Sequence, residues 1–385
     1  EEDMAFFLIL FVLLLLLPDA YVWLSFVRGT SALWSVLWWL PSGLALAALG
    51  AAAAGWVGNG PVRLFFFVLL CVAVPKLFFT VFSLLGRGIG TFVHGAAAAG
   101  HVAGIVVAVA VCGAFLYGSL YGWKRLVVRQ TDIVAADLPE AFDGYRIVQF
   151  SDLHVGTFGR DDRFVRALVG RIMAAEPDMI VFTGDLVNAS AAELDPHMRA
   201  LSRLRATDGV CSVIGNHDYC EYGSSGSSGG AEFDFEEVKR RQRELGREVL
   251  LNESRTIRRG TDSLVVLGVE NVGRPPFPSR GDLRQAMSGV GDGAFTILLS
   301  HDPSHWRREV LPETNVRLTL SGHTHAMQFR LGGFSPCGWA FAEWEGLSRE
   351  GDRMLFVSSG AGGTAPFRLG AWPRTEVLTL RRGAR

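Results

Sequence analysis

The chain has 385 residues, enough for more than one domain, and 49% of them are apolar. Its charges nearly cancel, with 37 Lys and Arg, 38 Asp and Glu and a formal net charge of −1. This balance argues against a nucleic-acid partner, because a protein binds a duplex through a basic surface that displaces counterions.

The apolar residues concentrate in the first third of the chain. A helix needs about 20 apolar residues to cross the hydrocarbon layer, where every backbone group must be bonded within the segment. Tyrosines and tryptophans near the ends of such segments are typical of the headgroup region. The alternative, a bundle of buried core helices, leaves too few polar positions to face water. We therefore predict four membrane-spanning helices, at residues 4–27, 33–57, 62–85 and 96–123.

The orientation of these helices follows from the charges beside them. The first segment begins with Glu-Glu-Asp rather than a basic stretch, so we expect a retained helix, not a cleaved signal peptide, with Met4 as a candidate start. Four spans place both ends on one side, and positive residues accumulate in the cytoplasm. We expect a multi-pass protein with a cytoplasmic downstream domain, and the irregularly spaced cysteines agree with a reducing compartment. The side of the membrane that holds both ends of the helical region carries Arg63, Lys124, Arg125 and Arg129. The opposite side carries Arg28 and Arg87.

Downstream of the spans, short β-branched runs alternate with amphipathic stretches, which predicts an α/β domain. We assign residues 1–123 to the membrane region, 124–140 to a linker and 141–385 to the folded domain. Residues 161–176 and 234–245 have the apolar stripes of helices. The candidate strands are 146–150, 179–183, 210–214, 264–269, 295–299 and 316–320.

A glycine-serine tract, GSSGSSGG, occupies residues 223–230. Its composition predicts a flexible loop that buries no core. It follows a candidate site loop directly, and three interpretations stay open: a lid, a native linker or an engineered replacement.

Polar motifs follow five of the candidate strands. In an open α/β sheet, the loops beyond the carboxyl ends of the strands converge on one crevice, so five of the nine histidines should meet there. Carboxylates, neutral imidazoles and an amide oxygen suit first-row divalent ions. The motifs are Asp152-Leu-His154, Gly184-Asp185, Gly215-Asn216-His217-Asp218, Ser300-His301-Asp302 and Gly322-His323-Thr324-His325.

This set resembles the calcineurin-like metallophosphoesterase superfamily, whose blocks are Asp-x-His, Gly-Asp, Gly-Asn-His-Asp, a separate His and Gly-His-x-His, in this order. The resemblance covers about residues 147–325, with terminal strands to about residue 380. It implies an α/β fold in which a four-helix transmembrane region precedes a metallophosphoesterase αββα sandwich. The chain is most similar to the bacterial branch with N-terminal membrane helices.

The resemblance also implies a dinuclear metal site. Two cations about 4 Å apart lower the pKa of a bridging water and neutralise charge during in-line attack on phosphorus. His217 would contact the scissile phosphate and protonate the leaving group, and Asp218 would orient His217. Manganese, iron, zinc and magnesium all suit the ligands. The implied ligands are Asp152, His154 and His325 for one ion and Asn216, His301 and His323 for the other, with Asp185 bridging both.

We therefore expect a membrane-anchored, metal-dependent hydrolase of a phosphodiester, phosphomonoester or pyrophosphate. Anchoring favours a lipid-linked substrate, because the bilayer concentrates it; a nucleotide-linked lipid pyrophosphate of outer-membrane glycolipid synthesis is one candidate that the superfamily suggests. A nuclease is disfavoured by the neutral charge balance. The alternative from another class is a transporter or receptor whose soluble domain only binds metal or phosphate, but the spans contain few ionisable residues. The oligomeric state stays open.

Four polar residues outside the motifs have plainer interpretations. Lys76, inside the third span, is expected to extend its ammonium toward the interface. Asn188 is expected to hydrogen-bond within its loop or to support the ligands. His197 is expected on an exposed helix face, and His305 at the surface or behind the ligands.

Overall fold

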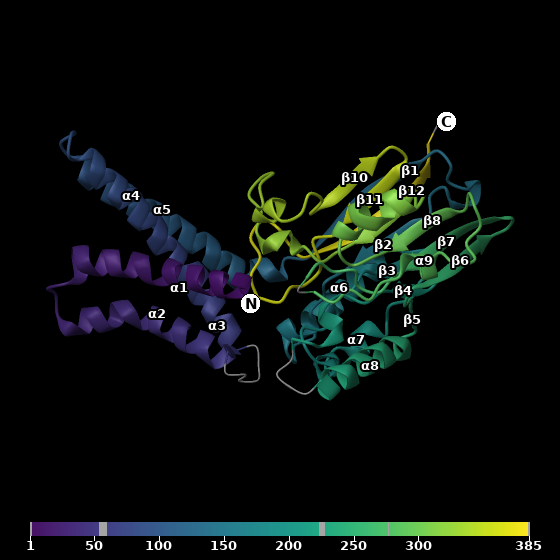
Figure 1. The fold of residues 1–385 in the computed structure, drawn as a ribbon, viewed down its shortest axis with the longest axis horizontal. Helices are drawn as coiled ribbons and strands as arrows, with labels where there is room; N and C mark the ends of the chain where they lie inside the picture. The colour runs from purple at the N-terminus through teal and green to yellow at the C-terminus, as the bar shows by residue number, and fades with distance from the viewer. Residues whose placement is uncertain (1, 54–59, 223–227, 276, 384–385) are drawn as a thin grey trace. The chain divides into compact units, whose positions relative to one another are not determined.

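The computed structural model describes residues 2–53, 60–222, 228–275 and 277–383 (Figure 1). The chain divides into two compact units, one of residues 1–121 with 365–367 and one of 122–364 with 368–385. Of the predicted flexible tract, residues 223–227 lie outside the described residues. The remaining residues, 228–230, form the first turn of helix α8 (Ser228–Glu244).

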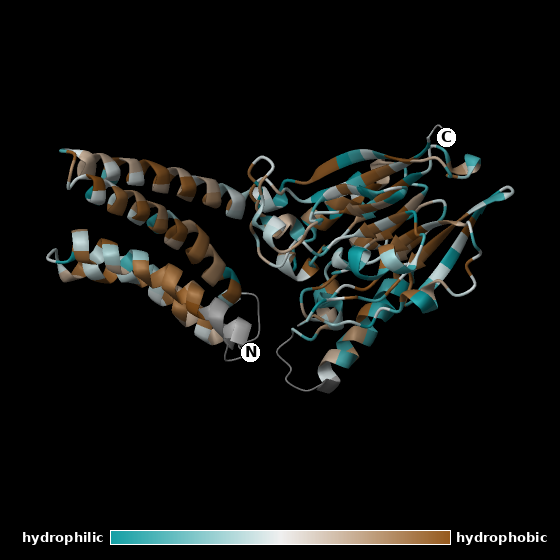
Figure 2. Ribbon diagram, turned by 45° about the horizontal axis from the view of Figure 1, so that its top comes forward, coloured by the Kyte–Doolittle hydropathy of each residue, from teal (hydrophilic) through white to brown (hydrophobic). Residues whose placement is uncertain are grey.

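The first unit is helical, and it contains four segments that are long and apolar enough to cross a membrane. Large apolar side chains on these helices, such as Leu17, Val102 and Val106, are exposed, and Figure 2 shows hydrophobic residues along the helices. The predicted spans are therefore confirmed as apolar helices where the structure describes them, and residues 54–57 of the second span lie outside the described residues. Their elements are α1 (Glu2–Val22), α2 (Ala32–Ala53), α3 (Gly60–Val68), α4 (Val74–Ile89) and α5 (Ala96–Leu120), with π-helical turns at Trp23–Val27 and Leu69–Ala73.

A charged pair lies within this helical unit. Lys76 Nζ donates a hydrogen bond to Asp19 Oδ1 at 2.6 Å and lies 4.1 Å from the centroid of the Trp38 ring. Ser42 Oγ donates to the other oxygen of the same carboxylate, which is fully buried. Because Asp19 neutralises the ammonium, Lys76 does not have to extend toward the interface as we predicted.

The second unit contains two six-stranded sheets, in the orders β1-β12-β2-β3-β4-β5 and β10-β11-β9-β8-β7-β6. The strands of the first sheet are β1 (Val127–Ala135), β2 (Arg146–Phe150), β3 (Met179–Phe182), β4 (Val210–Ser212), β5 (Arg247–Val249) and β12 (Arg374–Arg382). Those of the second are β6 (Glu253–Arg259), β7 (Asp262–Gly268), β8 (Phe295–Leu299), β9 (Leu318–Ser321), β10 (Gly346–Glu350) and β11 (Arg353–Val357). The α-helices besides α8 are α6 (Arg163–Ala174), α7 (Met198–Leu201), α9 (Leu283–Ala286) and α10 (Leu311–Glu313).

The sheets pack face to face between outer helical layers. Side chains alternate across each strand, so Ile147 joins the core between the sheets with Leu264, whereas its neighbour Val148 packs outward in a cluster with Leu168 of α6. On the far side, the second sheet packs against Trp306. This is the predicted αββα sandwich.

The predicted linker, residues 124–140, contains a strand. The nine residues of β1 pair in parallel with β12, from Val127 opposite Arg374 to Ala135 opposite Arg382. Ile133 of β1 is fully buried in the core between the sheets. Arg129, Gln130 and Asp132 interrupt the β-branched run of this segment, so the strand was not among our predictions.

The charged pair in the helical unit predicts a double-mutant cycle. Asp19→Ala should destabilise the protein by roughly 3–5 kcal/mol, because it leaves a buried ammonium without a counter-charge. Asp19→Ala should lower the midpoint temperature of thermal unfolding, and adding Lys76→Met should restore at least half of this decrease, measured for the whole chain in detergent. Midpoint losses that add across the two single variants would show that the pair contributes no coupling.

Candidate metal centre

The predicted site residues lie together, at the carboxyl ends of strands from both sheets. Asp152 and His154 follow β2, Asp185 follows β3, and Asn216 follows β4, all in the first sheet. The residues that follow β8 and β9, in the second sheet, are His301, His323 and His325. The site thus lies at one edge of the predicted sandwich. Two facing sheets each contribute part of the site.

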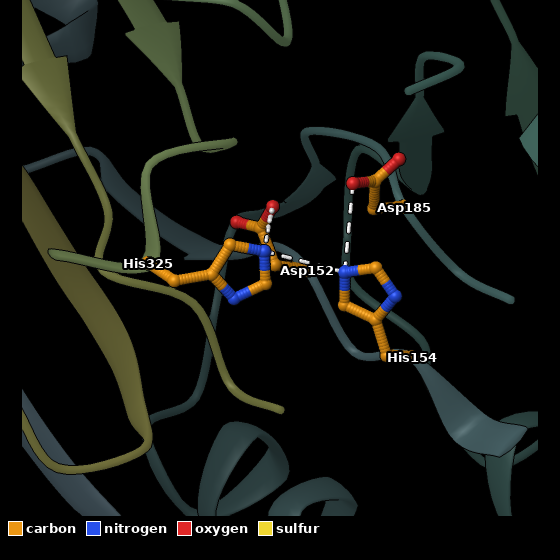
Figure 3. Close-up of side chains that lie close together, drawn as sticks. All are labelled: Asp152, His154, Asp185 and His325. Carbon is orange, nitrogen blue, oxygen red and sulfur yellow. Dashed lines mark hydrogen bonds and ion pairs between the residues drawn. The ribbon is translucent and has the colours of Figure 1, made fainter. Parts of the chain in front are cut away.

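Four residues form the first cluster of ligand atoms. One atom each of Asp152, His154, Asp185 and His325 lies within 4.8 Å of the others. His154 Nε2 is 3.3 Å from His325 Nε2 and 3.5 Å from Asp185 Oδ2. His325 Nε2 is 3.4 Å from Asp152 Oδ1. Figure 3 shows these contacts as a chain of dashed lines from Asp152 through His325 and His154 to Asp185.

Asp185 also belongs to a second cluster, with His301 and His323. His301 Nε2 lies 3.2 Å from Asp185 Oδ2 and 3.3 Å from His323 Nδ1. Asn216 Oδ1 completes this cluster, 3.0 Å from His323 Nδ1. The same oxygen of Asp185 therefore faces both clusters, as a bridging ligand would.

Burial sets the protonation of these groups. It lowers the pKa of His154 and of His323 to about 4, which favours the neutral imidazole that binds metals. Burial also raises the pKa of Asp152 to about 7. Burial also lowers the pKa of His301, but the charge and hydrogen bond of Asp185, the Asp152 charge and the Thr183 carbonyl together outweigh it and raise the pKa to about 10. The buried carboxylates thus require nearby positive charge, and the donor set fits divalent cations.

The backbone at most of these residues is left-handed. The φ angles are 52° at Asp152, 47° at His154, 62° at Asp185, 71° at His323 and 50° at His325. This conformation costs about 1–2 kcal/mol for each residue other than glycine. Such strain persists where the surrounding structure holds it and is typical of functional sites. Close packing contributes too, because a Cβ at Gly215 would collide with the Asp185 carboxylate.

Asp218 positions the backbone of two loops rather than the side chain of His217. Its Oδ2 accepts from the backbone N–H of Asp185 at 2.9 Å and of Gly215 at 3.0 Å. Its Oδ1 accepts from Leu186 N at 2.7 Å and Val187 N at 3.3 Å. We expected Asp218 to orient His217; in the structure it ties the loop after β3 to the loop after β4.

His217 is oriented by Asn188. Its Nδ1 lies 2.7 Å from the Asn188 carbonyl oxygen, and its ring centroid lies 4.7 Å from that of His154. Asn188 is held in turn by a hydrogen bond from Nδ2 to Thr157 Oγ1, at 3.0 Å. The half-buried imidazole therefore stands beside the first cluster with one nitrogen fixed.

Two further histidines are buried, one of them against our prediction. The prediction for His197 is wrong, because its side chain is fully buried and Nε2 lies 2.9 Å from Gly159 O. His305 is also fully buried, with Nδ1 2.9 Å from Ser300 Oγ and Nε2 3.3 Å from Glu309 Oε2. Asp302, the residue after His301, caps the turn by accepting from Ser304 N at 2.8 Å.

Three aromatic residues at the site lie outside every motif. Tyr222 OH accepts from Asn216 Nδ2 at 3.1 Å, which turns Asn216 Oδ1 toward His323. The rings of Phe277 and Phe341 meet the His323 ring at 5.2 and 5.6 Å between centroids. No sequence signal marks these residues, because their role depends on loops that approach only in the fold.

Comparison with known proteins supports a phosphoesterase. Residues 145–327 match the family profile described as Calcineurin-like phosphoesterase. The chain is 30% identical over 289 residues to the uncharacterized metallophosphoesterase YkuE of Bacillus subtilis, a match that covers 70% of this chain and 92% of YkuE. It is 25% identical over 296 residues to the UDP-2,3-diacylglucosamine pyrophosphatase LpxG of Chlamydia trachomatis, covering 64% of this chain and 86% of LpxG.

A vertebrate relative is described as a transmembrane protein with a metallophosphoesterase domain. This Bos taurus protein is 31% identical over 217 residues, which cover 55% of the present chain and 47% of that protein. The present chain thus matches about half of the length of the Bos taurus protein. The similarity to a transmembrane protein and the four apolar helices together indicate that the present chain is a membrane protein. The present chain belongs to the calcineurin-like phosphoesterase family and is a metal-dependent phosphoester hydrolase.

Proposed function

We propose that the protein is a membrane-anchored hydrolase that cleaves a phosphoester bond at a centre of two divalent cations. The observation that supports this proposal best is the position of Asp185 Oδ2. It lies 3.5 Å from His154 Nε2 in one cluster and 3.2 Å from His301 Nε2 in the other. One oxygen shared by two sets of ligands is the arrangement that a pair of neighbouring cations requires.

The proposed ligands divide between the two clusters. When bound, the two cations would supply Lewis-acid charge for a phosphoryl group and a more acidic water. Manganese, iron, zinc and magnesium remain candidates, because oxygen and imidazole ligands suit all four. The proposed ligands are Asp152, His154 and His325 for one ion and Asn216, His301 and His323 for the other, with Asp185 shared.

The protein's own groups position the reaction. The His217 backbone N–H donates to Asp185 Oδ1 at 2.8 Å, which leaves Oδ2 directed at both clusters. When His217 is protonated, Nδ1–H donates to Asn188 O, and the Nε2 proton is available to a leaving-group oxygen. Asp218 acts as a positioning residue, because it fixes the backbone from which Asp185 projects.

The substrate that we propose is lipid-linked. Four apolar helices would confine the enzyme to the bilayer, where an amphiphilic phosphoester is concentrated. The name of the LpxG relative describes a pyrophosphatase acting on UDP-2,3-diacylglucosamine, which supports a nucleotide-linked lipid pyrophosphate as one candidate. The near-zero net charge does not favour a nucleic acid substrate.

We further propose that the catalytic domain faces the cytoplasm. Lys124, Arg125 and Arg129 follow the last apolar helix closely, whereas Arg28 and Arg87 flank the opposite ends of the helices. A transporter or receptor has less support, since the Lys76 charge within the spans is paired with Asp19.

Metal content distinguishes the shared ligand from a terminal one. Asp185→Asn should reduce bound metal from about two ions per chain to fewer than one and abolish hydrolysis of an aryl phosphodiester, because both ions lose a ligand. His325→Ala should retain about one ion per chain. Elemental analysis of the purified whole chain provides the measurement, with Asp352→Asn, an 88% exposed carboxylate, as the control. Equal losses in the Asp185 and His325 variants would contradict the shared role.

The role of His217 as a proton donor can be tested by comparing leaving groups that need a proton with leaving groups that do not. His217→Ala should slow the release of an alkoxide by roughly 10²–10⁴-fold, because this leaving group needs a proton. Release of p-nitrophenolate should slow much less, since it departs without one. Rates for paired alkyl and p-nitrophenyl phosphodiesters check the difference, in variants whose metal content is unchanged. The same loss with both substrates would exclude proton donation.

Topology can be tested with a thiol reagent that does not cross membranes. Thr30→Cys, in the exposed turn after α1, should react in intact cells. Asp352→Cys, in the exposed turn between β10 and β11, should react only after permeabilisation. The unsubstituted chain gives the background from its five native cysteines. Labelling of position 352 in intact cells would place the domain on the other side.

A further inference from the structure

Exposed apolar side chains in the catalytic unit gather in one loop. Among the described residues from 122 onward, seven large hydrophobic side chains are exposed, and four of them lie between positions 327 and 339. We call these four residues the apolar rim. They are Met327, Leu331, Phe334 and Trp339, exposed by 47%, 72%, 48% and 82%. Soluble surfaces scatter such residues singly, so this concentration indicates an interaction surface.

The apolar rim is held by an ordered loop. Leu331 and Phe334 exchange backbone hydrogen bonds of 2.9 and 3.1 Å around a two-glycine turn. Ser335 Oγ donates to Ala326 O at 2.8 Å, which ties this turn back to the start of the loop. The rings of Phe334 and Trp339 pack edge to face with centroids 5.7 Å apart. The loop thus presents its apolar side chains in a defined shape.

Both ends of this loop reach the metal centre. Met327 lies two residues after the proposed ligand His325. Phe341, two residues after Trp339, packs its ring against His323 at 5.6 Å. Tyr222, also among the seven exposed residues, accepts a hydrogen bond from the proposed ligand Asn216. Whatever covers the apolar rim therefore lies next to the place where a phosphoester would react.

The chemistry of the loop favours lipid as the occupant. Residues 326–341 contain a single charged side chain, Arg330, and its Nη1 donates to both Glu345 oxygens at 2.9 Å. Tryptophan, phenylalanine and leucine on a neutralised surface are typical of segments that enter the boundary between headgroups and acyl chains. The connection between the apolar helices and the catalytic unit is also short. Residues 121–126 alone connect α5 to β1, and six residues span at most about 20 Å.

We propose that the apolar rim inserts into the surface of the bilayer that holds the protein's own helices. The metal centre then opens at the depth of the headgroups. This inference rests on the proposed phosphoester hydrolysis. It narrows the substrates to amphiphilic phosphoesters whose apolar part stays in the bilayer.

Fluorescence quenching by lipids tests the insertion. Trp339→Cys and Leu331→Cys, each labelled with bimane in the full chain, are reconstituted in vesicles of phosphatidylcholine and phosphatidylglycerol that carry a nitroxide near the glycerol end of one acyl chain. Both labels should lose at least about half of their intensity, because insertion brings them to the nitroxide depth. Val134→Cys, at a 42% exposed position in β1, is the matched control and should change little. Unchanged thermal midpoints establish that the variants fold.

Two outcomes would overturn the inference. In the first, the labels at 331 and 339 respond to aqueous iodide as the label at 134 does and are not quenched by lipid. In the second, they are protected from both quenchers, which would mean that protein covers the rim. The readout needs no turnover, so it is independent of the proposed function. A chain that inserts without hydrolysing any phosphoester refutes only the function, and one that hydrolyses an aryl phosphodiester without inserting refutes only the insertion.

Discussion

The shared carboxylate of Asp185 is the interaction on which the site depends. The His217 amide holds one of its oxygens, and the other lies between His154 and His301. Burial raises the pKa of the neighbouring Asp152 to about 7, because loss of water penalises the charged carboxylate, and the Asp185 charge adds to this effect. Positive charge is needed at this point, whereas burial lowers the pKa of two of the surrounding imidazoles, His154 and His323, and favours their neutral form. Divalent cations meet both conditions, since they compensate the acids and bind neutral imidazoles.

The fold keeps this arrangement against local preferences. Left-handed backbone at five proposed ligands costs energy that the loops alone would not bear. Parallel pairing of β2, β3 and β4 aligns one set of loops, and parallel pairing of β8 and β9 aligns the other. Asp218 then fixes two neighbouring loops through four backbone N–H groups. The core between the sheets thus sets the positions of side chains that project beyond its edge.

The sequence predicted the part of this site that short-range patterns encode. Apolar runs that end in Asp-x-His or Gly-His-x-His identify strand ends and donor atoms together, and the resemblance to the metallophosphoesterase blocks then named the proposed ligands among them. The assignment of each loop to one of the two sheets depended on long-range pairing, as did the position of β1 beside β12 at the edge of the first sheet. The partner of His217 was missed for the same reason, because Asn188 O is brought to it by the fold. Burial of His197 and His305 likewise depends on neighbours that no local pattern reveals.

Aromatic residues connect the metal centre to its surroundings. Phe277 and Phe341 pack against the His323 ring and contribute to its burial, which lowers its pKa to about 4. A proposed ligand is therefore kept neutral partly by rings that carry no polar group. Phe341 also continues the loop that presents Trp339 to the outside. In the membrane-inserted state that we propose, this one short loop would both keep the ligand imidazole neutral and guide an amphiphilic substrate to the site.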